Sequence, residues 1–103
     1  MDKTINWEDL HDATLKQITV DWGKESCELT LVLSSRSISV RAAGLRKLVL
    51  QSESPWGTSV SVNHARLLTQ VGDQFSTLKI EMQSGDPILI EAVRICAEIL
   101  GER

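Results

Sequence analysis

Two adjacent residues near the start of the chain, His11 and Asp12, have the side chains of a general acid–base pair. An imidazole oriented by a carboxylate is a common arrangement for moving a proton during catalysis. Neighbouring residues on a helix, however, point about 100° apart, so they are poor hydrogen-bond partners. No serine or cysteine stands in a recognisable activating context. We therefore predict capping or a surface hydrogen bond to the backbone at this position, and no catalytic residue.

Histidine and cysteine side chains also bind zinc, and the chain contains two of each. They are His11, Cys27, His64 and Cys96. Zinc sites are recognised by ligand pairs about two to four residues apart, and the sequence has no such pair. The six glycines never cluster into a loop that would cradle a phosphate. We expect no metal and no cofactor.

The best single candidate for recognition is Trp56, which stands between Pro55 and Gly57. A tryptophan offers a large rigid contact, and loops on a β scaffold commonly carry binding residues. Asn63 and His64 follow closely in sequence and complete the candidate binding set with His11 and Asp12. The alternative is that Trp56 folds back over one end of the core. Trp7 and Trp22 are predicted to be core residues, because the chain has few other aromatic side chains.

These residues must be positioned by the elements that the hydropathy pattern predicts. Apolar residues recur at every second position in several short segments, which is the period of a half-buried strand. The predicted strands are 16–22, 27–34, 37–42, 45–50, 78–83 and 88–92. The first two and the last two form hairpins. Gly44 is expected to separate the third strand from the fourth. The fourth strand is more continuously apolar, which is typical of a strand that is buried on both faces.

Three segments are less regular. Asn6 followed by Glu8 and Asp9 predicts a short N-terminal helix capped by the Asn6 side chain and ending before position 14. The stretch 64–68 fits either a strand or one helical turn, after a brief extended piece at 59–63. The apolar residues of segment 93–100 are spaced so that they fit one face of a helix or one face of a strand. The sequence thus predicts a mainly β fold of antiparallel hairpins, a small sandwich or partly open barrel with a short N-terminal helix. The alternative is an α+β fold with a C-terminal helix.

Charge is distributed unevenly along the chain, although the net charge is only −3. Residues 29–52 contain four basic residues and no acidic residue, whereas acidic residues predominate on both sides. We expect this basic band to form a solvated strand surface paired with the acidic segments, with an anionic partner as the alternative. The negative net charge argues against nucleic acid, which needs a basic surface.

With 103 residues, the chain has the length of a single domain, 1–103. No apolar run approaches the roughly 20 residues of a membrane helix, and the first residues show no apolar signal core. A cytoplasmic location without membrane contact is therefore expected. Cysteines stay reduced in that compartment. We predict that Cys27 and Cys96 are buried thiols, because both lie on segments whose pattern is typical of core residues.

Three local strings are spread along the chain between positions 7 and 86: WEDLHDA at 7–13, PWGTSVSVN at 55–63 and EMQSGD at 81–86. In these strings the chain resembles a family of small bacterial proteins of unknown function. The predicted architecture is also similar to that of β-rich immunity proteins, which neutralise bacterial toxins. Neither resemblance implies an activity or a site residue.

Segregated charge, a candidate anchor and the lack of catalytic patterns favour a non-enzymatic protein-interaction module, of which an immunity-type inhibitor is one form. Its partner is expected to be another protein, and an unpaired sheet edge offers a route to a homodimer. The alternative is a small-ligand-binding domain or minor enzyme with a pocket on a sheet face. In that case His11, Asp12 and His64 would line the pocket.

Overall fold

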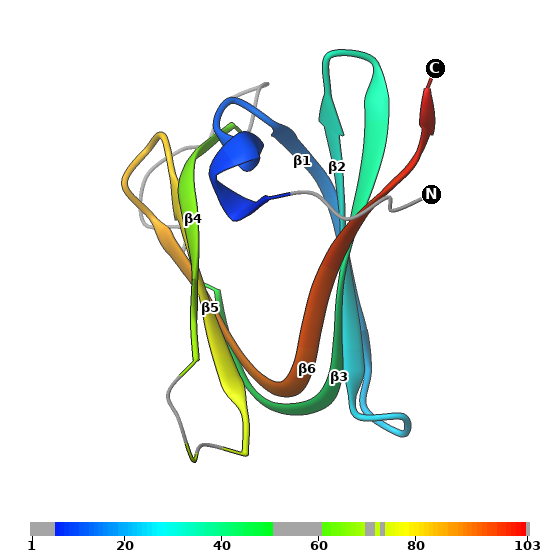
Figure 1. Ribbon diagram of the computed structural model, residues 1–103, viewed down its shortest axis with the longest axis vertical. Coiled ribbons are helices and arrows are strands. Elements are labelled where there is room, and N and C mark those ends of the chain that lie inside the picture. Colours follow the sequence, from blue (N-terminus) through cyan, green and yellow to red (C-terminus); the bar gives the residue numbers. More distant parts are fainter. Residues whose placement is uncertain (1–5, 51–60, 70–71, 73, 103) are drawn as a thin grey trace.

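The computed structural model describes residues 6–50, 61–69, 72 and 74–102, and the strands among them form one antiparallel sheet (Figure 1). The strands are β1 (Thr14–Asp21), β2 (Ser26–Leu33), β3 (Arg36–Leu50), β4 (Val62–Leu68), β5 (Ser76–Met82) and β6 (Pro87–Glu102). Their order across the sheet is β1-β2-β3-β6-β5-β4. The predicted mainly β class is confirmed, and the sheet stays open rather than closing into a barrel.

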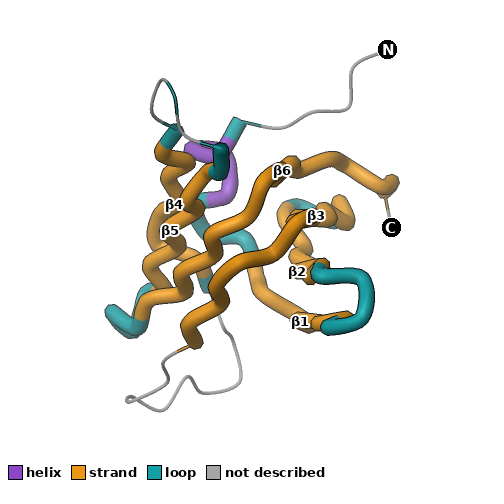
Figure 2. Tube along the Cα trace, turned by 90° about the horizontal axis from the view of Figure 1, so that it is seen from below, coloured by secondary structure: helices purple, strands orange, loops and turns teal. Residues whose placement is uncertain are grey.

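The sheet folds back on itself because its two longest strands, β3 and β6, bend together (Figures 1 and 2). One half consists of β1, β2, the start of β3 and the end of β6. The other half consists of β4, β5 and the remaining parts of β3 and β6, as the pairing registers require. The predicted separation of 37–42 from 45–50 at Gly44 is therefore wrong, because β3 continues through this glycine and only bends there.

The core lies between the two facing halves. Leu29, Leu31 and Val40 are fully buried on one half, and Leu78 and Ile90 are fully buried on the other. All belong to one cluster of buried apolar residues. Each such side chain contributes roughly 1.5–3 kcal/mol when it is removed from water. The alternating pattern thus identified the inward face of the strands correctly.

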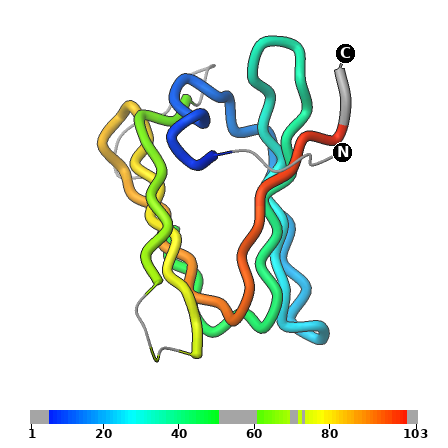
Figure 3. Tube along the Cα trace, in the orientation of Figure 1, coloured from blue at the N-terminus to red at the C-terminus, as the bar shows by residue number. Residues whose placement is uncertain are grey.

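A short 3-10 helix, η1 (Trp7–Leu10), precedes β1 and lies against β4 (Figures 1 and 3). It buries Leu10 in the core, and Trp7 packs against the same cluster. The predicted Asn6 cap is wrong, because the Asn6 side chain makes no capping bond. The backbone carbonyl of Asn6 accepts from the Asp9 N–H instead. This helix is far too short to cross a bilayer, and no helix in the described part of the chain has the length and hydropathy to do so.

Four further expectations concern where strands end and which of their residues are buried. Trp22 is 75% exposed, so its predicted core position is wrong: β1 stops at Asp21, and Trp22 opens the turn to β2. The segment 93–100 belongs to β6, so the alternative of a C-terminal helix is also wrong. The stretch 64–68 is strand and belongs to β4. Beyond Leu45, residues 46–50 are intermediate or exposed, which contradicts the expected cover on both faces.

Candidate functional site

The chain leaves η1 through an unusual backbone turn that brings His11 and Asp12 into contact. Asp12 has a φ of 70°, in the left-handed region, so the two side chains do not splay apart as they would on a helix. His11 Nδ1 lies 3.3 Å from Asp12 Oδ2, and the side chains are 58% and 64% exposed. The predicted surface position is confirmed, but the predicted partner is wrong: the two neighbouring side chains contact each other, and within the described residues no cap or backbone bond takes the place of this contact.

Asp12 also connects three segments that are far apart in sequence. Gln83 Nε2 donates to Asp12 Oδ1 over 2.6 Å. The Asp12 N–H donates to the Val62 carbonyl over 2.8 Å, and the Val62 N–H donates to the Ala13 carbonyl over 2.8 Å. A single β-bridge between Thr14 and Ser61 continues this contact. We call this set of bonds the clasp, because it joins the two edge strands β1 and β4 at one end.

The clasp lacks the parts of a catalytic centre. Within the described residues, His11 has Asp12 as its polar side-chain contact and no hydroxyl or thiol within hydrogen-bonding distance. The described residues also contain no group of three or more potential ligands that is placed to hold a metal ion. What the arrangement can do is hold the backbone of two strands together through an exposed carboxylate.

The structure brings only some of the predicted binding residues together. Asn63 is the bulged residue between Val62 and His64, and its Nδ2 donates to Glu81 Oε1 over 2.7 Å. It therefore lies next to the clasp. His64 lies opposite Glu81 on the exposed face of the sheet and lines a groove that neither His11 nor Asp12 reaches. Trp56 lies outside the described residues.

That groove, the β4 groove, is the feature that sequence reasoning missed. It has a volume of about 400 Å³ and crosses the outer face of the second half, from β4 over β5 and β6 to β3. The apolar side chains of Val49, Pro87 and Leu89 line one part of it. Arg66 and Lys79 line the part nearest the sheet edge.

Arg66 and Lys79 occupy directly opposite positions on β4 and β5. Two like charges in this position repel each other and destabilise the strand pair. In the described part of the chain, neither cation has an ion pair or hydrogen bond. Glu81, the acidic residue in the same groove, accepts the bond from Asn63. The β4 groove therefore carries two cations without an ion pair among the described residues, against the single carboxylate of Glu81, beside an apolar surface.

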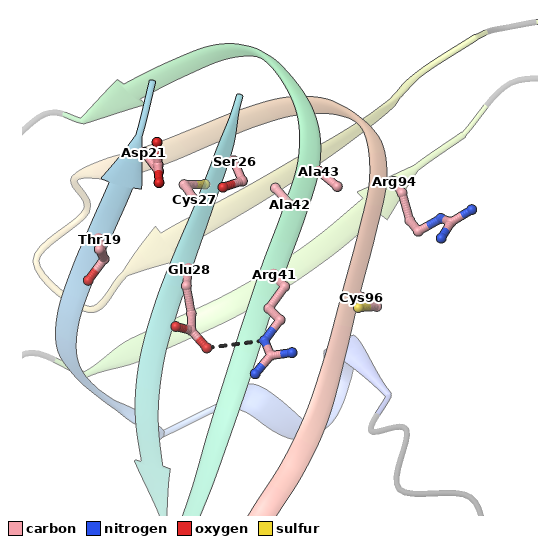
Figure 4. A pocket seen from close by; sticks show the side chains of 10 residues that line it. All are labelled: Thr19, Asp21, Ser26, Cys27, Glu28, Arg41, Ala42, Ala43, Arg94 and Cys96. Atoms are coloured by element: carbon pink, nitrogen blue, oxygen red, sulfur yellow. Dashed lines mark hydrogen bonds and ion pairs between the residues drawn. The ribbon is translucent and has the colours of Figure 1, made fainter. Parts of the chain in front are cut away.

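A second groove, the β2 groove, lies over β1, β2, β3 and β6 in the first half and has a volume of about 410 Å³ (Figure 4). Here Arg41 is paired with two carboxylates: Arg41 Nε lies 3.2 Å from Glu28 Oε2, and Arg41 Nη1 lies 3.8 Å from Glu98 Oε1. The buried Ser39 hydroxyl donates to the same Glu28 oxygen over 2.5 Å. The Ser39 bond first, and then Arg41, hold the pKa of Glu28 below its ordinary value. For Arg41, the expected pairing of the basic band is thus confirmed.

Arg94 also lines the β2 groove, and in Figure 4 its side chain extends away from the Glu28–Arg41 pair. Cys27 and Cys96 are both free thiols. Cys27 is buried as predicted, and burial raises its pKa. Cys96 is exposed, so its predicted burial is wrong: it lies on the outer face of β6, opposite Arg41.

Comparison with known families and with curated proteins found no match to this chain.

Proposed function

We propose that this protein is a non-enzymatic protein-interaction module that binds its partner through the β4 groove. The observation that carries the proposal is the opposed pair Arg66 and Lys79, which faces solvent without an acidic partner among the described residues. A like-charged pair costs stability in the free protein, whereas a partner that supplies carboxylates turns the same pair into an attraction.

The groove also has the composition of a contact surface. Val49, Pro87 and Leu89 provide apolar area next to the two cations. Protein interfaces typically combine an apolar centre with charged groups at the rim, and arginine is enriched in them. The β2 groove fits this role less well, because Arg41 is already paired with two carboxylates.

The alternative, a small-ligand binder or minor enzyme, finds less support. It required His11, Asp12 and His64 to line one pocket, but the β4 groove contains only His64 of the three. Asp12 is already engaged by Gln83. If His11→Ala changes stability alone, the enzyme alternative fails.

We place this module in the cytoplasm of a bacterial cell, where free thiols such as Cys27 and Cys96 stay reduced. An inhibitor of the immunity type is the specific form we propose. A second copy of the chain, joined through an edge strand, is the homodimeric variant. We expect neither nucleic acid nor a membrane as partner, given the net charge of −3.

The test is affinity capture of the tagged native chain from the lysate of its own cells, with protein and small-molecule eluates analysed by mass spectrometry. Four baits are compared: the native chain, Arg66→Glu with Lys79→Glu, Trp56→Ala, and Arg94→Glu as the matched control on the other half. A stoichiometric protein that is lost with the double reversal and retained with Arg94→Glu supports the proposal. A retained metabolite without any protein contradicts it and supports the ligand-binding alternative.

A further inference from the structure

Within the part of the chain that the structure describes, no strand pairs with the outer edge of β4, next to the β4 groove. β4 is the last strand of the sheet, and of its residues only Val62 makes backbone hydrogen bonds on the side away from β5 in the described part of the chain. Unpaired N–H and C=O groups along an edge are a template for an extended segment of another chain. The clasp occupies the start of this edge and leaves residues 63–68 for such a segment.

The side chains that β4 presents on its outer face have a defined order. His64, Arg66 and Leu68 lie at alternate positions, and the inward-facing residues Ala65 and Leu67 lie between them. Leu68 is 39% exposed. An added strand places its own outward side chains beside these three, because paired strands share the period of two residues.

We infer that the β4 edge binds an extended acidic segment of a partner protein, with carboxylates at two alternate positions facing His64 and Arg66. Lys79 lies opposite Arg66 on β5, the strand on the inner side of β4, and adds to the positive electrostatic potential at that point. The next outward residue of the partner is apolar and packs against Leu68. This inference rests on the proposed function and specifies the partner's chemistry and its mode of binding.

Backbone hydrogen bonding, not charge, selects a carboxylate-bearing segment over a nucleic acid, because the net charge of −3 acts on carboxylates and phosphates alike. A peptide strand uses the backbone hydrogen bonds of the edge, which a nucleic acid cannot use in this way. The carboxylates provide orientation and association rate, and the backbone bonds provide the remaining affinity.

The probe is a short synthetic peptide with glutamate at alternate positions and valine or threonine between them, measured by fluorescence anisotropy at low and at high salt. Arg66→Glu and Lys79→Glu should each weaken binding by about tenfold or more, whereas Arg94→Glu should change it by less than about twofold. A peptide with glutamine in place of glutamate should bind more weakly, and added salt should reduce the affinity of the glutamate peptide alone. Hydrogen exchange should show new protection at residues 63–68.

A separate measurement excludes unfolding as the cause of lost binding. Lys79→Glu replaces a repulsive cross-strand pair by an attractive one, so this variant should be more stable than the native chain by about 0.2–1 kcal/mol in urea denaturation. Loss of binding together with equal or higher stability supports the inference.

In the binding measurements, any of four results would overturn it: equal affinity for the glutamine peptide, equal loss with Arg94→Glu, protection outside β4, or equally tight binding of a single-stranded oligonucleotide. If a protein partner is captured equally well by the charge-reversal variant and at high salt, the acidic-strand inference fails while the proposed interaction module stands. If no protein is captured by the native chain, the proposed function itself fails.

Discussion

Ser39 is a fully buried polar residue on an otherwise solvated sheet face, and Glu28 explains how its hydroxyl is satisfied. The Ser39 hydroxyl donates to Glu28, and Arg41 approaches the same carboxylate oxygen from the neighbouring position on β3. Both contacts favour the ionised carboxylate, so the pKa of Glu28 is lowered in the folded chain. In the unfolded chain these contacts are absent.

This difference predicts how Glu28→Gln changes stability with pH. A carboxyl with a lowered folded-state pKa stabilises the fold above its unfolded pKa, and this contribution is lost as the pH falls through the folded value. The variant should therefore be less stable than the native chain near neutral pH, by about 0.5–1 kcal/mol for so exposed a pair. The gap should close in acid, as measured by urea denaturation across the pH range. A gap that is independent of pH would show that packing, not ionisation, is responsible.

The two thiols should differ in reactivity. Burial of Cys27 raises its pKa and blocks access, whereas Cys96 is exposed on the outer face of β6. Titration of the native protein with a thiol reagent at neutral pH should therefore modify one thiol rapidly, and denaturation should release the second. Cys96→Ser should abolish the rapid phase, and Cys27→Ser should leave it intact. Two rapid thiols in the native protein would contradict the burial of Cys27.

At the scale of the elements, the bend shared by β3 and β6 depends on Gly44. Its φ is +68°, and a Cβ at this position would lie 2.7 Å from Val93 Cγ2 and 2.8 Å from Val93 Cβ. The register shifts just beyond it, between Leu45 and Lys47, and the Leu45 N–H bonds to the Glu25 carbonyl in the β1–β2 turn. A side chain at position 44 therefore meets both an unfavourable backbone conformation and a steric clash.

Gly44→Ala should destabilise the fold by about 2–5 kcal/mol, since a left-handed conformation costs about 1–2 kcal/mol and overpacking about 1–3 kcal/mol. Gly85→Ala is the matched control, because Gly85 also has a positive φ of +95° but nothing within 4 Å of the added Cβ. It should lose only the backbone part. Urea denaturation of both variants measures the difference, and equal losses would mean that Val93 moves aside without cost.

The elements themselves were largely predictable, whereas their continuity was not. Alternation at 27–34 and 78–83 identified strands and their buried faces, because a half-buried strand has a period of two. The same pattern predicts Trp22 on the buried face, because alternation alone does not show that β1 already ends at Asp21. Glycine at position 44 predicted an interruption, but a glycine serves equally well as the pivot of a bent continuous strand.

At the scale of the molecule, prediction was limited by strand pairing. The sequence shows that Lys79 alternates with apolar neighbours, but only the register of β4 with β5 places it opposite Arg66. Long-range pairing is set by the packing of the whole sheet and leaves no local signature. For the same reason, the link from Asp12 to Gln83, distant in sequence, has no local signature. The contact between His11 and Asp12 goes against the expectation from helix geometry, because Asp12 has a positive φ.

The clasp gives this open sheet one connection between its edges, so Asp12 should control how easily the molecule opens. Asp12→Ala should cost about 1–3 kcal/mol, because it removes the bond to Gln83 and puts a residue poorly suited to the left-handed region at a φ of 70°. Asp12→Gly loses the same bond without the backbone penalty and should cost less. In both variants the Val62 amide, which donates to the Ala13 carbonyl, should exchange faster than the Val40 amide in the core. Equal acceleration at both amides would mean that the molecule opens only by global unfolding, and an unchanged Val62 amide would mean that Asp12 does not hold the two edges together.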